Sequence, residues 1–246
     1  VRSKDSDTHV IPTDTLYITI DKEAVRRSGM MMASDTIPDR MVISLAGKRA
    51  IYKNDMMMLE MLAQCNWERP LYVATTVGSD NYMNLGDNFV QEGLAYRITP
   101  FNTKAPGAKN FDTEKVYNNV MNRFKWGGLD KPGLYIDETV MRMCYTHRHL
   151  LAQLAMQLIA EGQNAKAEKV LRKAEKVLPE YNVPYTFLSG AADMARAYAL
   201  IGKKADAACI LNKVWADAKS YADYYLQLTG SRFMMSQNEV LRQLYI

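Results

Sequence analysis

A repeat in the second half of the sequence constrains the fold more than any other feature. From Asp137 onward the pattern is helical, and aligning Gly162 with Gly202 brings small and apolar residues into register at an offset of 40 residues. The pairs that coincide are Ala155 with Ala195, Ala165 with Ala205, Ala167 with Ala207, and Leu171 with Leu211. Repeats of this length indicate stacked helical hairpins, whose helices approach closely where side chains are small. The sequence therefore predicts two tetratricopeptide-like hairpins.

The first copy of the repeat fits the tetratricopeptide template from Leu151 to Pro179. A longer loop, Pro179–Leu188, separates it from the second copy. We expect Ser220–Ile246 to form a terminal helical element, broken at Gly230, that caps the stack. Such hairpins commonly bind peptides, but a pair of them also serves as a structural brace, so the repeat predicts the fold and leaves the function open.

The residues before the repeat predict a small sheet domain. Alternating β-branched residues predict strands at Thr15–Ile20 and Met41–Leu45. A helix is expected to end near Cys65, and its methionines at helical spacing, Met57 and Met61 among them, are expected to fill the core.

The resulting fold class is α+β. We expect a linker or disordered leader over residues 1–14, a small mixed α/β sheet domain over residues 15–135, and a tetratricopeptide-like helical repeat domain over residues 136–246.

The densest group of polar and aromatic residues outside the helical pattern lies between residues 66 and 100. This stretch predicts a strand at Leu71–Thr76, a polar loop, a short helix near Tyr82–Gln91 and a strand at Leu94–Thr99. Ligands of α/β layers bind beyond the carboxyl ends of the strands, where arginine can hold an anion and tyrosine can stack on a sugar ring. The candidate binding residues are Arg69, Tyr72, Asp80, Asn81, Tyr82, Glu92, Tyr96 and Arg97.

Two other interpretations of these side chains stay open. Arg69 and Arg97 could simply pair with Glu68 and Glu92. Alternatively, Glu92 and either Asp80 or Asp87 could flank a sugar as glycosidases require.

Composition and spacing argue against several other kinds of site. The net charge of +4 is spread along the chain without a Lys/Arg block, which argues against a nucleic-acid partner. Cys144, His147 and His149 look metal-like, but on a helix the third residue is rotated by about 140° from the first, so no metal site is expected. Phosphate-loop and hydrolase-elbow motifs are missing from the sequence. We therefore predict no cofactor and no catalytic residue.

Three segments of the central stretch, residues 57–74, 78–82 and 92–100, carry a family resemblance. Their wording (MMLEMLAQCNWERPLYVA, GSDNY and EGLAYRITP) resembles the soluble C-terminal region of a bacterial family of multi-spanning membrane proteins. That family is related to the transmembrane protein O-mannosyltransferases, and so to the GT-C class of glycosyltransferases that use polyprenyl-linked sugars.

The resemblance implies a non-catalytic extracytoplasmic domain that follows the last membrane span, on the periplasmic side of the inner membrane. In such enzymes the catalytic residue lies on loops between membrane helices. The expected partners are the membrane-spanning part of the same polypeptide and a protein or glycan acceptor. A peptide- or protein-binding helical-repeat adaptor and a soluble hydrolase are the two alternatives.

Overall fold

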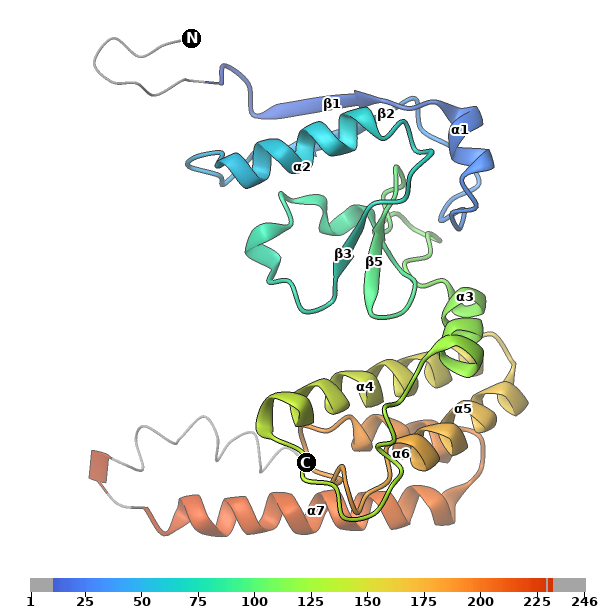
Figure 1. Ribbon diagram of the computed structural model, residues 1–246, viewed down its shortest axis with the longest axis vertical. Helices are drawn as coiled ribbons and strands as arrows, with labels where there is room; N and C mark the ends of the chain where they lie inside the picture. Colours follow the sequence, from blue (N-terminus) through green and yellow to red (C-terminus); the bar gives the residue numbers. More distant parts are fainter. Residues whose placement is uncertain (1–10, 229, 232–246) are drawn as a thin grey trace. The chain divides into compact units, whose positions relative to one another are not determined.

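The computed structural model describes residues 11–228, 230 and 231, and the chain divides into two compact units, Val1–Asp112 and Thr113–Ile246. Small antiparallel sheets form the first unit and helices form the second, which confirms the predicted α+β class (Figure 1). The division falls earlier than the boundary expected at residue 135. Thr113 and Met121 belong with the helices because Thr113 Oγ1 donates to Glu161 and Lys173 Nζ donates to the Met121 carbonyl, both at 2.8 Å.

The first sheet is a two-stranded antiparallel pair, β1 (Thr15–Thr19) and β2 (Arg40–Ser44), in which Thr15 lies opposite Ser44. Between them α1 (Lys22–Arg27) begins at Asp21, whose carboxylate accepts the amides of the first turn. The inward residues of β2, Met41 and Ile43, are buried, as the period-2 alternation predicts.

Helix α2 (Lys53–Gln64) presents different faces to the core and to solvent. At its start the Asp55 carboxylate accepts the Tyr52 amide at 3.0 Å, the reciprocal half of a capping box. Leu62 is only 1% exposed, whereas Met57 and Met61 are 56% and 52% exposed. The expectation that the whole methionine stripe fills the core is therefore wrong for Met57 and Met61, because residues four apart share one face and theirs points outward.

The second sheet contains β3 (Tyr72–Ala74), β4 (Phe89–Gln91) and β5 (Ala95–Ile98) in the antiparallel order β3-β5-β4. The predicted helix near Tyr82–Gln91 is wrong. Two short 3₁₀ turns, Ser79–Asn81 and Leu85–Asn88, and strand β4 occupy this region.

The backbone between the two 3₁₀ turns explains why no helix forms. Met83 and Asn84 have φ values of 50° and 58°, a left-handed conformation that a continuous right-handed helix does not admit. The strands of this sheet are antiparallel. The expectation that a ligand binds beyond their carboxyl ends therefore no longer applies, because that rule holds for parallel sheets.

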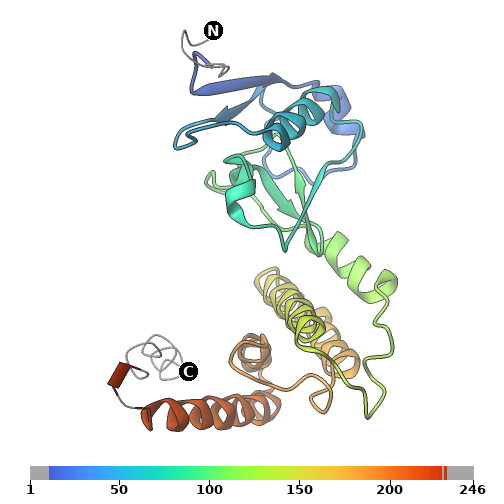
Figure 2. The same ribbon diagram turned by 60° about the vertical axis from the view of Figure 1, so that its left-hand side comes forward.

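The described part of the second unit contains two successive helical hairpins (Figure 2). It begins with α3 (Thr113–Asn118) and a π-helical turn, Asn119–Arg123. The hairpin helices are α4 (Glu138–Ala160), α5 (Asn164–Val177), α6 (Ala191–Leu200) and α7 (Lys204–Leu226). Helix α4 packs against α5 and α6, and α6 packs against α7.

The offset of 40 residues corresponds to this architecture. Gly162 and Gly202, with φ values of 74° and 82°, turn the chain between the two helices of each hairpin. The alanines at 155, 195, 167 and 207 are all buried at the helix contacts. Helix α7 already contains Ser220, the expected start of the terminal element, and residues 232–246 of that element lie outside the described residues.

Candidate functional site

Three of the candidate residues form a polar network inside the first unit. The Tyr72 hydroxyl donates to Glu92 Oε2 at 2.5 Å, and Arg97 Nη1 lies 3.7 Å from Glu92 Oε1. The cross-strand register of β3 and β5 places Tyr72 directly opposite Arg97. Burial, and then the hydrogen bond to Glu92, raise the pKa of Tyr72 to about 12.

Glu92 and Arg97 are buried in this network, with side chains 3% exposed. Arg97 Nη2 also donates to the Ser28 carbonyl at 3.1 Å, which connects β5 to the end of α1. The ion pair that the sequence offered as an alternative for Arg97 is thus present. These two charges stabilise the sheet and do not face solvent, where a ligand would meet them.

Two further candidates, Tyr82 and Tyr96, pack on Phe89. The ring of Tyr82 meets Phe89 edge-on at 4.9 Å, and Tyr96 stacks on Phe89 at 5.6 Å. The Tyr82 hydroxyl donates to the Val77 carbonyl at 2.9 Å. Burial raises the pKa of Tyr96, with a smaller contribution from Tyr82. This arrangement orders the loop before β4.

The remaining candidates, Arg69, Asp80 and Asn81, are exposed. The Asp80 carbonyl accepts from Lys48 Nζ at 3.2 Å, which ties its loop to the turn after β2. Arg69 and Arg97 border the same narrow space, which is too small for a water molecule. The structure thus separates the eight candidates into a polar network in which Glu92 and Arg97 are buried and Tyr72 is 45% exposed, an aromatic cluster, and an exposed polar group.

The second unit contains a groove that was not predicted from the sequence. It has a volume of about 570 Å³, and α4, the loop before α6 and one residue of α7 form its walls. Its lining combines aromatic and apolar residues with polar and charged ones: Ile136, Glu138, Met141, Arg142, Tyr145, Thr146, His149, Thr186, Phe187, Leu188 and Tyr221. Phe187 and Tyr221 meet edge-on at 6.3 Å. A volume of this size suits a short peptide segment or a small ligand.

One residue of the groove lining, His149, belongs to a histidine–aspartate pair. His149 Nδ1 lies 3.4 Å from Asp193 Oδ2 on α6, and His149 Nε2 lies 3.1 Å from the Leu188 carbonyl oxygen. The hydrogen bond that His149 donates to the Asp193 carboxylate is the largest of the causes that raise the pKa of His149, and the same contact lowers the pKa of Asp193.

One sequence signal could have identified the groove. Glu138, Arg142, Tyr145 and His149 recur every three or four residues, so they share one face of α4. The same helix carries the Cys-x-x-His-x-His motif, in which Cys144 is buried while His149 is exposed. Among the described residues no group of three His, Cys, Asp or Glu side chains could hold a metal ion.

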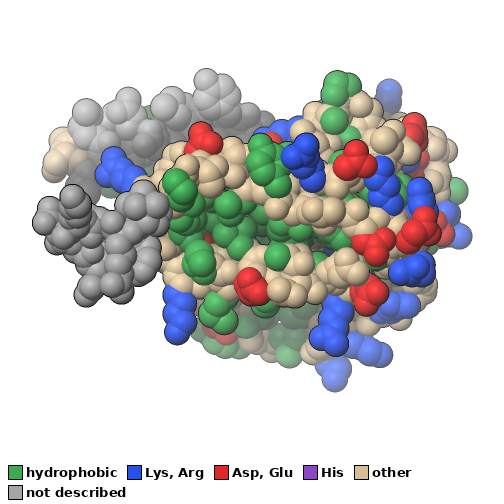
Figure 3. Space-filling view, turned by 90° about the horizontal axis from the view of Figure 1, so that it is seen from above, with side chains coloured by type: hydrophobic (Ala, Val, Ile, Leu, Met, Phe, Trp, Pro, Cys, Tyr) green, Lys and Arg blue, Asp and Glu red, His purple; other side chains and the backbone are tan. Residues whose placement is uncertain are grey.

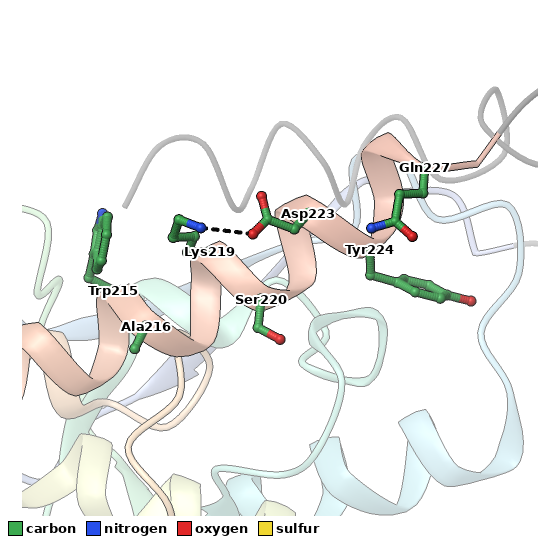
Figure 4. A pocket seen from close by; sticks show the side chains of 7 residues that line it. All are labelled: Trp215, Ala216, Lys219, Ser220, Asp223, Tyr224 and Gln227. Atoms are coloured by element: carbon green, nitrogen blue, oxygen red, sulfur yellow. Dashed lines mark hydrogen bonds and ion pairs between the residues drawn. The ribbon is translucent and has the colours of Figure 1, made fainter.

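The outer face of α7 presents a second, shallower hollow (Figure 4). All of its lining residues, from Trp215 to Gln227, belong to α7 or to the residue directly after it, and Lys219 pairs with Asp223 at 2.9 Å. With one helix as its only described wall, this surface has no group positioned to act on a ligand.

Comparison with known families concerns the first unit. Residues 1–117 match the family model of TMEM260-associated domain 2. No curated protein and no solved structure matches the chain.

The match to TMEM260-associated domain 2 covers both sheets and most of α3, and it ends before the groove and the helical hairpins. It links the first unit to a domain associated with a membrane protein. In the described part of the chain, none of the helices is both long and apolar enough to cross a membrane.

Proposed function

We propose that this chain is a non-catalytic domain of a membrane-embedded glycosyltransferase-like protein, on the periplasmic side of the inner membrane. There it positions an acceptor or packs on the membrane-spanning part of the same polypeptide. The observation that supports this proposal is the match of residues 1–117 to TMEM260-associated domain 2. The sequence resemblance to the C-terminal region of a mannosyltransferase-related family agrees with it.

The surface of the first unit offers a region suited to each role. Arg69, Asp80 and Asn81 present exposed polar groups that can bind an acceptor. Hydrophobic side chains gather on the face that bears β1, β2 and α2 (Figure 3). The exposed hydrophobic residues of β1, β2 and α2, with the residue before α2, include Tyr17, Val42, Tyr52, Met56, Met57 and Met61. An apolar surface of this kind suits packing against another part of a protein.

The acceptor role is tested in the full-length protein by sugar transfer in membranes. We expect Arg69→Ala and Asn81→Ala to reduce transfer while the amount of protein in the membrane stays constant, because both side chains are exposed. The control is Arg26→Ala, an exposed arginine of the same unit whose side chain is 57% exposed. Arg97 is unsuitable for this test because it is buried. Transfer that is unchanged in both variants would contradict the acceptor role.

The membrane association is tested by blotting native fractions with an antibody against this chain. We expect a band in the membrane fraction far above 28.0 kDa, the mass of the chain itself. A band near 28.0 kDa in the soluble fraction would overturn the proposal and leave the second candidate function.

The second candidate function is peptide binding by the groove of the helical unit. Its lining combines the aromatic rings of Tyr145, Phe187 and Tyr221 with polar groups, as peptide-binding surfaces commonly do. A peptide library displayed on phage should enrich a common motif on the wild type and lose it on Tyr145→Ala. The variant Trp215→Ala changes an exposed aromatic residue outside the groove and should retain it. Equal enrichment on all three proteins would exclude the groove as the binding site.

The hydrolase alternative receives little support from the described side chains. Glu92 is engaged by Tyr72 and Arg97, and Asp87 pairs with Lys104 at 2.6 Å. Both nitrogens of His149 face oxygen atoms, so neither is placed to take a proton from a nucleophile.

A further inference from the structure

The loop between α5 and α6, residues 178–190, is attached to α4 by two consecutive side chains of different chemistry. Arg148 donates to the carbonyls of Leu178, Val183 and Pro184, at 3.1, 2.5 and 3.0 Å. The next residue, His149, contacts the other end of the loop at Leu188. The first attachment carries a charge that persists at all physiological pH values, and the second carries a charge that titrates.

The contacts of His149 require its doubly protonated form. A neutral imidazole has one N–H donor and one bare lone pair. Here one ring nitrogen faces the Leu188 carbonyl oxygen and the other faces the Asp193 carboxylate, and both of these oxygens are acceptors. In either neutral tautomer a nitrogen lone pair would point at an oxygen, so only the imidazolium satisfies both contacts.

The site around His149 is closely packed. Gly190 has a φ of 74°, and a Cβ atom added there would lie 3.0 Å from both the ring and the main chain of His149. Residues 186–189 form a turn in which Ser189 Oγ donates to the Thr186 carbonyl and accepts the Thr186 amide. A change at His149 is therefore transmitted directly to this turn, which forms one wall of the groove.

We propose that His149 is a proton-dependent clamp: in its charged form it holds residues 186–190 against α4, and loss of its proton releases this wall of the groove. Residues 180–185 stay attached at any pH in this range, because Arg148 and Asn182 hold them; Asn182 Nδ2 donates to the carbonyls of Leu129 and Lys131 at 2.7 and 2.6 Å. The clamp does not depend on either proposed function, because it concerns the loop itself.

Several other charged or titratable groups surround the clamp. Asp193 on α6 raises the pKa of His149, and Arg148 on α4 lowers it to a smaller extent. On α7, Asp217 accepts the Phe187 amide, and burial raises the pKa of this carboxyl group. Glu138, Arg142, Tyr145 and Tyr221 line the same groove, and Arg196 acts on Asp193.

The sign of the pH effect follows from these contacts. The pKa of folded His149 lies above the ordinary value of 6.5, so its contribution is complete below pH 6.5 and is lost as pH rises through the folded value. The carboxylates act in the opposite sense, since protonation of Asp217 in acid weakens its bond to Phe187. The wall is thus held best in mildly acidic solution.

The experiment is amide hydrogen exchange of the whole chain, read by nuclear magnetic resonance from pH 5.5 to pH 8.5, with rates expressed as protection factors. We expect protection at Leu188, Ser189 and Gly190 to fall as the imidazole signals of His149 titrate. Protection at residues 182 and 183 should stay constant. Asp193→Asn should move the His149 midpoint and the loss of protection together to lower pH.

Two histidine variants complete the test. His149→Gln removes the titrating group, so residues 188–190 should show at pH 5.5 the low protection of the wild type at pH 8.5. His147→Gln is the matched control, because His147 lies on the same helix and contacts the Met143 carbonyl instead of the loop. Protection that is constant with pH in the wild type, or that changes equally in His149→Gln, would overturn the clamp. If His149→Gln does not fold, the pH dependence of the wild type and of Asp193→Asn, a variant of an exposed residue, still tests the proposal.

Discussion

The guanidinium carbon of Arg148 lies 4.8 Å from the ring centroid of Tyr185, and both side chains are buried. Burial lowers the pKa of Arg148 to about 10, which leaves the side chain charged at neutral pH. Burying a charge is costly unless it is hydrogen-bonded. Here three main-chain carbonyls accept from Nη1 and Nη2 of Arg148 and the face of an aromatic ring lies against the guanidinium, while Nε has no hydrogen-bond partner among the described residues.

We predict that Arg148→Ala destabilises the helical unit by about 3 kcal/mol, because it leaves buried carbonyls without donors and opens a cavity. Arg142→Ala on the same helix should cost less than about 0.5 kcal/mol, since that side chain is 72% exposed. Urea unfolding followed by circular dichroism measures both values. Equal losses in the two variants would show that the carbonyl contacts of Arg148 add no stability.

Comparing two glycines that have the same backbone conformation separates the effect of loop packing against α4 from the effect of backbone strain. Gly162 and Gly190 both have φ values of 74°, but an added Cβ meets nothing within 4 Å at Gly162 and lies 3.0 Å from His149 at Gly190. Both alanine variants should lose about 1 kcal/mol through backbone strain. Gly190→Ala should lose about 1 kcal/mol more through overpacking. Thermal unfolding of both variants tests this difference, which would vanish if the loop moved aside freely.

Neighbouring residues of α2 test the assignment of its faces. Leu62→Ala should destabilise the first unit by about 2–5 kcal/mol, because Leu62 is 1% exposed in the core. Met61→Ala should change stability by less than about 0.5 kcal/mol, because Met61 is 52% exposed. Urea unfolding distinguishes them, and a large loss in Met61→Ala would mean that this face is covered in solution.

The raised pKa values of Tyr72 and Tyr185 predict a loss of stability in alkali. Each phenol titrates at about 12 in the folded chain, against its ordinary value of 10.0. Their contribution to stability is complete below pH 10 and is lost as pH rises toward 12, because the unfolded chain releases these protons first. Unfolding experiments at a series of alkaline pH values measure this decline, and a constant stability up to pH 12 would contradict it.

The variant Glu92→Gln isolates the part that the hydrogen bond contributes at Tyr72. Replacing the carboxylate by an amide should lower the pKa of Tyr72. The pKa of Tyr185 should not change, because burial is the largest cause of its rise and Glu92 is not among the causes. The carbon chemical shifts of the two labelled rings report both titrations. An unchanged Tyr72 titration would show that burial alone sets its pKa.

The elements that could be predicted from the sequence are those specified by local patterns. The alternation in β1 and β2 and the glycines at 162 and 202 mark strands and turns through neighbouring residues alone. The helix predicted near Tyr82 is wrong because the left-handed conformation of Met83 and Asn84 has no strong sequence signal. The burial of Met57 and Met61 could not be judged, since hydrophobicity does not reveal which face of a helix a neighbour covers.

The candidate site was harder to predict because it depends on distant residues. Burial of Glu92 and Arg97 follows from the pairing of β4 and β5, which converts an apparent binding pair into an internal ion pair. The groove requires α4 to meet Tyr221 of α7 and the loop at Leu188. Contacts between residues so far apart in the sequence give only a weak sequence signal, which here is the spacing of polar residues along α4.

The exposed methionines of α2 have a chemical consequence. Thioether sulfur is oxidised to the sulfoxide where oxidants reach it, and Met56, Met57 and Met61 are each more than half exposed, whereas Met41 and Met83 are 1% exposed. Mild peroxide should therefore modify these three methionines of α2 faster than Met41 and Met83 while the chain remains folded. Each sulfoxide would turn an apolar contact surface into a polar one, so the oxidation state of α2 would determine which surfaces it can adhere to.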